Sequence, residues 1–255
     1  VKYSQLERVP TASELRHPVI REAMKLVGID GQYLELTSMP DIPAGTGLGS
    51  SGSFTTALLK ALHAHKKNLI HPQELAEQAC HIEIDLLKEP IGKQDQYGCA
   101  LGGVNLIEFH TDGSVTYETV PLTIGQRRQM EQNLIMFYLG GTRSASELLS
   151  TQAQNTMSNP QAVDNLKAMV EQARTLRADL CHDVDSLGPY LHEGWMRKQS
   201  LSSGISSPLV KSAYDLALDA GATGGKVLGA GGSGFLLLFA PGGAPEAVAG
   251  ALALY

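Results

Sequence analysis

The sequence predicts a globular chain of one or two domains in which α-helices and β-strands both occur. The chain has 255 residues, of which 43% are hydrophobic and 18% charged, and this is enough to form a sizeable core. Several segments carry apolar residues at three- and four-residue steps, as one face of a helix does. Other segments alternate in polarity or form short continuous apolar runs, which is typical of strands.

The expected elements follow one another along the whole chain. Helices are predicted at residues 18–27, 54–65, 73–88, 161–180, 187–200 and 208–220. Strands are predicted at residues 33–37, 102–109, 114–120, 133–139 and 227–239, the second and third forming a hairpin. A change of pattern at residues 124–126 predicts a domain boundary, so the two domains would cover residues 1–125 and 126–255.

Composition narrows the classes of function. The net charge is −6 and no basic run occurs, which indicates that nucleic acid is not a partner. Cys80, Cys99 and Cys181 are scattered and form no Cys-x-x-Cys pair, so neither a disulfide framework nor a zinc site is indicated. No signal peptide or long apolar segment occurs, so we expect no membrane partner and a cytoplasmic location.

A glycine-rich loop is the most informative stretch. Residues 43–52 read Pro-Ala-Gly-Thr-Gly-Leu-Gly-Ser-Ser-Gly. Three glycines at alternate positions allow a tight turn and close approach to a ligand. Ser50 and Ser51 stand where the next helix should begin, and Ser is a favoured N-cap. A loop of this kind presents free N–H groups and the positive end of a helix dipole, which suits a phosphate group.

Other interpretations of this loop are a plain turn before a core helix and two known nucleotide loops. The spacing Gly47-x-Gly49-x-x-Gly52 matches the dinucleotide fingerprint of NAD-dependent dehydrogenases. That fingerprint follows a buried parallel strand, and Pro40 and Pro43 argue against a strand here. The Walker A pattern fails because no Lys follows the last glycine. The residues therefore favour a phosphate loop of another kind.

Two carboxylates also draw attention. Glu83 shares the apolar face of the helix predicted at residues 73–88, and a buried carboxylate is costly unless it is paired or binds a metal. It is either the partner of a core Arg or Lys, or a ligand of Mg²⁺. Asp95 lies in a short polar turn after Pro90 and Gly92, where an Asp is commonly a turn or cap residue.

Two later segments are candidates for contact with an anion or a nucleotide. Arg143 stands among small residues after the strand at 133–139, as an anion ligand or as a salt-bridged residue at the strand end. Residues 221–234 are rich in glycine and lead into an apolar strand. Their Gly229-x-Gly231-x-x-Gly234 pattern precedes a strand rather than a helix, so it fails as a dinucleotide fingerprint.

Taken together, these motifs resemble those of the GHMP kinase superfamily. The loop Pro-x-x-x-Gly-Leu-Gly-Ser-Ser at 43–51 is similar to its nucleotide-binding motif. Gly92-x-x-Asp95-Gln96 is similar to its catalytic element, and residues 221–239 are similar to its third motif. The resemblance spans essentially residues 1–239.

The resemblance implies an α+β, two-lobed GHMP kinase fold with a ribosomal protein S5 domain 2-like N-terminal lobe and a ferredoxin-like C-terminal lobe. It implies an ATP-dependent phosphotransferase that acts on an alcohol group and uses Mg²⁺. The implied ATP-binding residues are Pro43, Gly45, Thr46, Gly47, Leu48, Gly49, Ser50, Ser51 and Gly52. The implied metal ligands are Ser51 and Glu83, and Asp95 would orient and deprotonate the acceptor hydroxyl.

Within the superfamily the chain is most similar to the D-glycero-D-manno-heptose 7-phosphate kinases, in residues 41–54, 140–149 and 198–203. This implies phosphorylation of the anomeric hydroxyl to a 1,7-bisphosphate, for the synthesis of nucleotide-activated heptose. The implied substrate-binding residues are Arg143, Lys198 and Gly231. The implied partners are ATP and a sugar phosphate, and a homodimer is left open.

Two alternatives and one departure accompany this resemblance. The alternatives are another GHMP kinase, of the fucose or galactose type, and a non-catalytic nucleotide or sugar sensor. The presence of Ser51, Glu83 and Asp95 together speaks against the sensor. The family's first motif, an N-terminal strand and loop, does not occur here, so we expect that an N-terminal part of the fold is missing from this chain.

Overall fold

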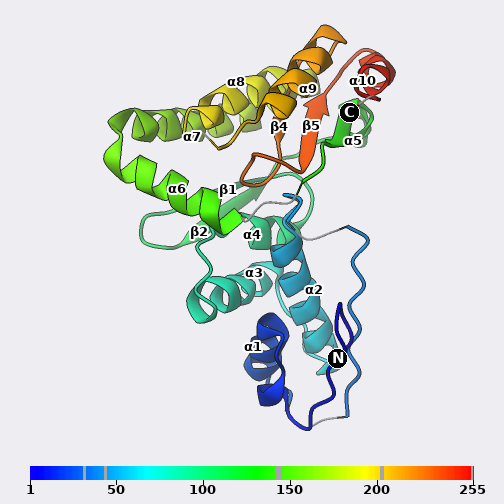
Figure 1. The fold of residues 1–255 in the computed structure, drawn as a ribbon, viewed down its shortest axis with the longest axis vertical. Helices are drawn as coiled ribbons and strands as arrows, with labels where there is room; N and C mark the ends of the chain where they lie inside the picture. The colour runs from blue at the N-terminus through cyan, green and yellow to red at the C-terminus, as the bar shows by residue number, and fades with distance from the viewer. Residues whose placement is uncertain (31–32, 43–44, 142–144, 202–203, 254) are drawn as a thin grey trace. The chain divides into compact units, whose positions relative to one another are not determined.

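The computed structural model describes residues 1–30, 33–42, 45–141, 145–201, 204–253 and 255, with the side chains of 145–148 left undescribed. The chain forms two compact units (Figure 1). Unit 1 comprises Val1–Ala44 and Gly49–Gly103, and unit 2 comprises Gly45–Leu48 and Val104–Tyr255. The glycine loop is therefore shared, because residues 45–48 pack with unit 2. These units are defined by which residues pack together and are not family domains. The domain boundary expected between residues 125 and 126 therefore stays a prediction.

Unit 1 is built from helices. They are α1 (Pro18–Val27), α2 (Ser50–His65), α3 (Pro72–Cys80), the π-helix η2 (His81–Leu86) and α4 (Gln94–Leu101), after a single turn η1 (Ala12–Glu14). The bounds of α1 match the prediction, since Pro18 occupies its first turn and Gly28 ends it in the left-handed conformation. Apolar faces of α1, α2 and α3 form the core, which includes Ile20, Met24, Leu58, Leu59, Leu62, Leu75 and Ile82.

Two predictions about unit 1 are wrong. The helix expected at 73–88 is α-helical only to Cys80 and continues as η2, in which the Leu87 N–H reaches back five residues to the Ile82 carbonyl at 3.0 Å. The segment at 33–37 is not a strand. Among the described residues it makes a single bridge, between Thr37 and Lys2, and Lys2 alone pairs with it through backbone hydrogen bonds.

Unit 2 begins with the predicted hairpin. Strands β1 (Asn105–Phe109) and β2 (Val115–Thr119) are antiparallel, with Ile107 opposite Tyr117. Helix α7 packs against β1, and the guanidinium of Arg174 on α7 forms an ion pair with Glu108 at 2.9 Å. The hairpin is thereby joined to the helical part of unit 2.

A second sheet forms the centre of unit 2. Strands β3 (Leu134–Tyr138), β5 (Phe235–Phe239) and β4 (Gly224–Val227) are antiparallel in the order β3-β5-β4. The helices of this unit are α5 (Ile124–Asn133), α6 (Ala145–Ser158), α7 (Pro160–Leu180), η3 (Val184–Ser186), α8 (Leu187–Gln199), α9 (Pro208–Asp219) and α10 (Ala244–Leu252). Helices α8 and α9 pack on β4 and β5.

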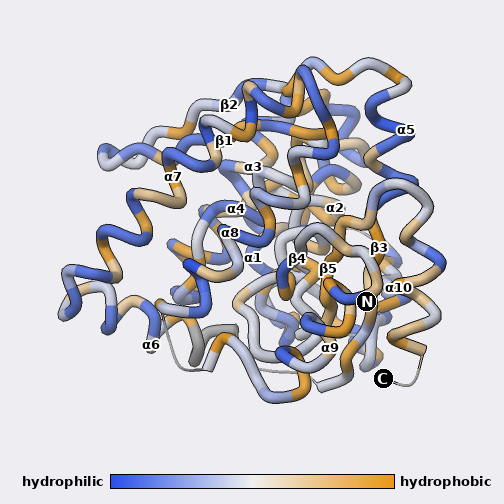
Figure 2. Tube along the Cα trace, turned by 90° about the horizontal axis from the view of Figure 1, so that it is seen from above, coloured by the Kyte–Doolittle hydropathy of each residue, from blue (hydrophilic) through white to orange (hydrophobic). Residues whose placement is uncertain are grey.

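The apolar run in β5 explains the position of this core. Its trace lies at the hydrophobic end of the scale in Figure 2, and Leu236, Leu238 and Phe239 have no exposed surface. Trp195 of α8 and Tyr214 of α9 are each 2% exposed in the same cluster. Unit 2 therefore has its own core, with the single tryptophan inside it.

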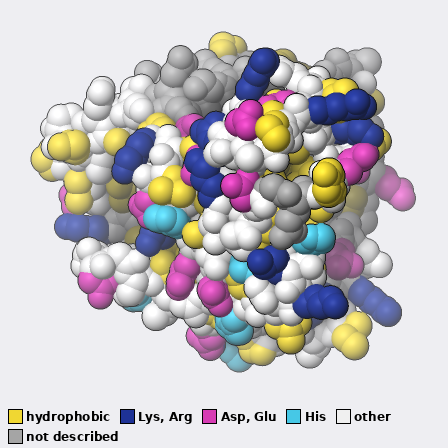
Figure 3. Space-filling view, turned by 90° about the horizontal axis from the view of Figure 1, so that it is seen from below, with side chains coloured by type: hydrophobic (Ala, Val, Ile, Leu, Met, Phe, Trp, Pro, Cys, Tyr) yellow, Lys and Arg dark blue, Asp and Glu magenta, His cyan; other side chains and the backbone are white. Residues whose placement is uncertain are grey.

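The surface carries charges of both signs. Basic, acidic and histidine side chains are interspersed over the face shown in Figure 3. Within the described part of the chain, no helix combines the length and the apolar character that crossing a membrane requires.

Candidate functional site

A buried carboxylate lies at the centre of the predicted residues in unit 1. Glu83 of η2 is 1% exposed. The Ser51 hydroxyl of α2 donates to its Oε1, and the Gln96 amide of α4 donates to its Oε2 at 2.5 Å. No ion pair among the described residues includes Glu83, so no core Arg or Lys is seen to neutralise it. Three helical segments thus converge on one carboxylate.

The local backbone at Glu83 is unusual. The Glu89 N–H donates to the Glu83 carbonyl at 3.0 Å, beyond the four-residue reach of an α-helix. This six-residue bond closes the end of η2 and is wider than the five-residue bonds of the π-helix itself. π-Helices are rare and often occur at functional sites. No pattern in the sequence signals the π-helix, since its apolar spacing also fits a continuous α-helix.

Asp95 lies in the first turn of α4, not in a polar turn as predicted. Its side chain is exposed and packs on the start of α2. A Cβ placed on Gly49 would lie 3.1 Å from Asp95 Cγ, and one placed on Gly52 would lie 3.0 Å from Asp95 Cβ. The Asp95 side chain therefore occupies the space that a side chain at Gly49 or Gly52 would fill. We call Ser51, Glu83, Asp95 and Gln96 the carboxylate cluster.

The start of α2 can receive an anion. Its N-cap is Gly49, in the left-handed conformation at φ 65°, and no side chain caps it. The prediction that a serine caps this helix is therefore wrong, because Ser50 and Ser51 are already helical. The first N–H groups of a helix have no partner within it, and here no side chain replaces that partner. A phosphate group would fit such an end.

The donor set of the carboxylate cluster suits a hard cation. Ser51 Oγ, the Glu83 carboxylate and Gln96 Oε1 are all oxygens, and Gln96 Oε1 is buried with no hydrogen-bond partner in the described part of the chain. Mg²⁺ prefers oxygen ligands and takes one or two carboxylates beside the phosphates of a nucleotide. The described residues contain no group of three or more His, Cys, Asp or Glu side chains that could hold a metal. Binding of Mg²⁺ by one carboxylate together with nucleotide phosphates does not require such a group.

The charges of this cluster affect a neighbouring thiol. Desolvation raises the pKa of Cys99 on α4, and the negative charges of Asp95 and Glu83 raise it further. Both carboxylates therefore lie near Cys99.

The other half of the glycine loop belongs to unit 2. Thr46 is fully buried, and its carbonyl accepts from the Phe235 N–H at 3.3 Å. Gly47 has φ +87°, and a Cβ placed on it would lie 2.6 Å from the Leu228 carbonyl oxygen. A Cβ on Gly229 would in turn lie 2.7 Å from Gly47 Cα. We call residues 45–48 and 228–234 the glycine junction.

Two predicted substrate residues lie at this junction. The Lys198 ammonium at the end of α8 donates to the Gly229 carbonyl. Gly231 is buried, and a Cβ on it would lie 3.0 Å from the Ile205 carbonyl oxygen. Pro43 and Arg143 lie outside the described residues. Within unit 1 the structure brings together residues 49–52, Glu83 and Asp95, and within unit 2 residues 45–48, Lys198 and Gly231.

One residue of the cluster was not predicted as a site residue. Gln96 was noted only as the residue after Asp95 in the motif. Its burial and its bond to Glu83 depend on the packing of α4 against α3. No sequence pattern within either helix predicts this packing.

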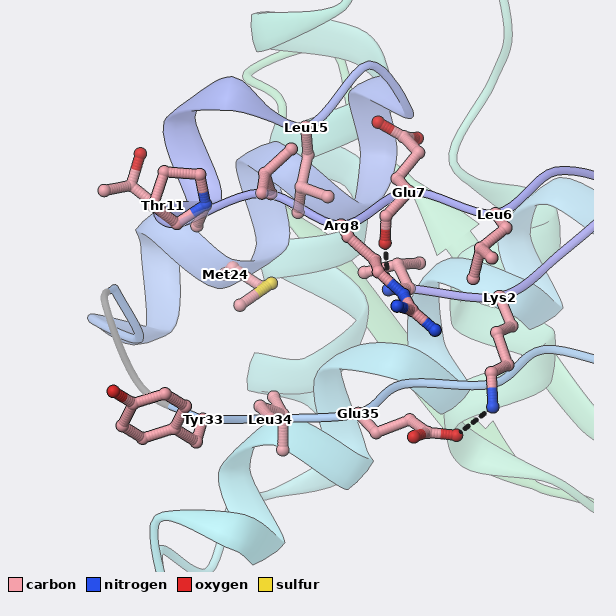
Figure 4. A pocket seen from close by; sticks show the side chains of 14 residues that line it. Lys2, Leu6, Glu7, Arg8, Thr11, Leu15, Met24, Tyr33, Leu34 and Glu35 are labelled. Carbon is pink, nitrogen blue, oxygen red and sulfur yellow. Dashed lines mark hydrogen bonds and ion pairs between the residues drawn. The ribbon is translucent and has the colours of Figure 1, made fainter.

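A pocket of about 420 Å³ lies elsewhere in unit 1 (Figure 4). Ten of the first fifteen residues, Met24 of α1 and residues 33–35 contribute its lining. Apolar side chains such as Leu6 and Leu34 face it beside the ion pair of Lys2 with Glu35. Its lining includes none of the predicted site residues that the structure describes, and its mixed character selects no class of ligand.

Two family models match the chain. Residues 17–103 match the N-terminal domain of the GHMP kinases, and residues 157–255 match the C-terminal domain. The match to the first model includes the whole carboxylate cluster.

Individual relatives agree with these models. The chain is 27% identical over 205 residues to the D-glycero-alpha-D-manno-heptose 7-phosphate kinase of Campylobacter jejuni, covering 80% of this chain and 60% of that enzyme. It is 26% identical over 238 residues to the L-fucokinase/L-fucose-1-P guanylyltransferase of Bacteroides fragilis, covering 91% of this chain and 24% of that protein. The chain thus spans 60% or less of the length of these relatives.

The fold has solved counterparts. The whole chain aligns with 72% of a D-glycero-D-manno-heptose 1-phosphate kinase from Bacteroides thetaiotaomicron, with a TM-score of 0.70 and 25% identity. The predicted α+β fold class is therefore confirmed.

Proposed function

We propose, from the premise that this chain belongs to the GHMP kinase family, that it forms the catalytic part of an ATP-dependent kinase whose acceptor is a hydroxyl group of a sugar phosphate. The observation that supports this most directly is the carboxylate cluster. Ser51 and Glu83 are joined by a hydrogen bond, and Asp95 contacts the two glycines that flank Ser51. These are the residues to which the family resemblance assigns metal binding and catalysis.

Three residues of the cluster, Ser51, Glu83 and Asp95, have a role in the proposed reaction. The uncapped start of α2 and residues 45–48 bind the phosphates of ATP through backbone N–H groups. Ser51 and Glu83 would hold Mg²⁺, which when bound would supply positive charge beside the transferred phosphate. The acceptor oxygen forms a bond to the γ-phosphorus as the bond to ADP breaks, and the Asp95 carboxylate takes the hydroxyl proton. With ATP as the donor, we expect this reaction to take place in the cytoplasm.

The acceptor we propose is D-glycero-D-manno-heptose 7-phosphate, phosphorylated at its anomeric hydroxyl to the 1,7-bisphosphate. The similarity to the C. jejuni enzyme supports this choice. Arg143 and Lys198 would bind the existing phosphate, Arg143 by two parallel hydrogen bonds and Lys198 as a point charge, with Gly231 beside them. The product would supply the synthesis of nucleotide-activated heptose.

A second acceptor is favoured by one comparison. The B. fragilis protein is named an L-fucokinase, and its similarity covers 91% of this chain. L-Fucose is therefore the alternative substrate.

A panel of acceptors tests the proposal. ADP release by the full-length protein would be measured with D-glycero-D-manno-heptose 7-phosphate, the corresponding 1-phosphate, L-fucose and D-galactose. We expect the highest kcat/KM with the heptose 7-phosphate. A higher kcat/KM for L-fucose would reassign the acceptor. If none of the four sugars supported ADP release, the proposed kinase activity would be contradicted. The Asp95→Asn protein serves as the control for contaminating kinases.

A further inference from the structure

Gln96 is a buried polar residue to which the proposed reaction gives no role. It is 1% exposed and follows Asp95 directly on α4. A primary amide offers two N–H donors and one carbonyl acceptor. One donor is used, in the 2.5 Å bond from Nε2 to Glu83 Oε2. The acceptor Oε1 is buried and has no partner in the described part of the chain.

The used donor determines how the Glu83 carboxylate is presented. Ser51 binds Oε1 of this carboxylate and Gln96 binds Oε2, so both oxygens are held and the plane of the group is defined. Without Gln96, Oε2 would be left buried with one partner fewer, and the carboxylate would rotate more freely. Because Gln96 lies on α4 and Ser51 on α2, the orientation of Glu83 depends on both helices.

The unused acceptor points to a group that binds at this position. Buried polar atoms in folded proteins nearly always have a hydrogen-bond partner. A donor is therefore needed beside Gln96 Oε1. Mg²⁺ retains several of its waters when proteins bind it, and each of these waters is a donor.

We propose that Gln96 is a positioning residue for the divalent cation. Its Nε2 orients Glu83, and its Oε1 accepts a hydrogen bond from a water bound to the cation. The inference rests on the proposed function, in which Ser51 and Glu83 hold Mg²⁺ beside the nucleotide. Outer-shell partners of this kind contribute about 10–100-fold to metal affinity.

The test measures cation binding rather than activity. Binding of Mn²⁺ to the full-length protein in the presence of ADP would be followed by electron paramagnetic resonance. Gln96→Met removes both amide functions at similar length, and we expect it to weaken Mn²⁺ binding about 10–100-fold. Binding of ADP without metal should be unchanged. General damage to the fold would weaken ADP binding as well.

A matched control is present in the same unit. Gln78 of α3 donates through Nε2 to Glu74 at 3.3 Å, and its Oε1 is bonded to His63 at 2.8 Å. Gln78→Met therefore removes a similar amide–carboxylate contact away from the cluster, and it should leave Mn²⁺ binding unchanged. If Gln96→Met does not fold, Gln96→Asn replaces it, since the shorter amide cannot reach Glu83.

The outcomes separate this inference from the function on which it rests. Wild-type affinity for Mn²⁺ in a folded Gln96 variant would overturn the positioning role alone. Equal weakening by Gln78→Met would also overturn it, because the effect would then be general. A wild-type protein that binds no Mn²⁺ with ADP would contradict both the metal site and the proposed function.

Discussion

The carboxylate cluster and the glycine junction are held together in opposite ways. In the cluster, side chains make the contacts, as Ser51 and Gln96 do when they donate to Glu83. In the junction, backbone meets backbone, since Gly47 and Gly229 approach each other with no room for a Cβ. The two halves of one loop thus depend on different properties of its residues. The carboxylate cluster requires particular functional groups, and the glycine junction requires that side chains be absent.

This difference predicts how substitutions will act. Changes in the cluster should alter rate and metal dependence while the fold is kept. Changes in the junction should alter stability before they alter chemistry, because the space there is already filled by backbone.

The largest effect is expected at Asp95. Asp95→Asn keeps the shape and removes the charge, and loss of general-base assistance should lower kcat by about 10²–10⁴-fold. The affinity for ATP should change little, because the loop and the metal ligands remain. Steady-state kinetics would check both values, with Asp112→Asn in the β1–β2 turn as the control. Unchanged kcat with poor ATP binding would make Asp95 a nucleotide-binding residue instead.

Glu83 should affect the metal rather than the fold. Glu83→Ala removes the carboxylate, so the Mg²⁺ concentration for half-maximal turnover should rise at least by the ~10–100-fold that loss of an outer-shell partner costs. A titration of rate against Mg²⁺ would measure this, with the exposed Glu74→Ala as the control. A lower melting temperature with unchanged Mg²⁺ dependence would show that Glu83 is structural.

In the junction, Gly47→Ala should destabilise the protein. The residue would be strained at φ +87°, which costs about 1–3 kcal/mol, and its Cβ would meet the Leu228 carbonyl. Gly250→Ala on α10, in the same unit, is the opposite case, since nothing lies within 4 Å and a helical Ala gains about 0.5–1 kcal/mol. Denaturant unfolding followed by Trp195 fluorescence would compare them. Equal stability of the two variants would refute the close packing at Gly47.

Lys198 tests which ligand the junction affects. A hydrogen bond to a charged group contributes about 1.5–3 kcal/mol, so Lys198→Ala should raise KM for the sugar phosphate about 10–150-fold. We expect a smaller rise in KM for ATP, and the same pattern for Arg143→Ala. Because Lys198 also donates to Gly229, a larger rise for ATP would instead assign it to holding the glycine junction.

The smallest effect is a pH dependence confined to unit 1. Desolvation lowers the pKa of His17, and the charge of Glu7 only partly opposes this. Its neutral Nδ1 accepts from the Ile20 N–H at 3.4 Å and caps α1. A pKa lower in the folded than in the unfolded state gives stability that is present above pH 6.5 and is lost as the pH falls through the folded pKa.

The protection factors of the α1 amides, which correct for the slower intrinsic exchange at lower pH, should therefore fall below pH 6.5, while the fluorescence of Trp195 in unit 2 stays constant. His17→Asn keeps a side-chain cap without titrating, and it should remove the pH dependence. An equally steep acid response in that variant would exclude His17 as the cause.

The sequence predicts best the features that depend on local patterns. Helices α1, α7 and α9 and strand β3 were predicted within about a residue, because their apolar periodicity and their Pro and Gly ends are local signals. The residues of the carboxylate cluster were also found in the sequence, apart from Gln96. In the proposed reaction their residue types are needed for chemistry, and they stand in a recognisable order.

The sequence by itself determined the fold class, most helices, and the pairing of a glycine loop with Ser51, Glu83 and Asp95. Only the tertiary structure decided that η2 is a π-helix, that Gly49 rather than a serine caps α2, and that Gln96 holds Glu83. These features arise where segments distant in the chain compete for the same space. Gly49 and Gly52 accommodate Asp95 from more than forty residues away, and no local pattern of the loop encodes that neighbour.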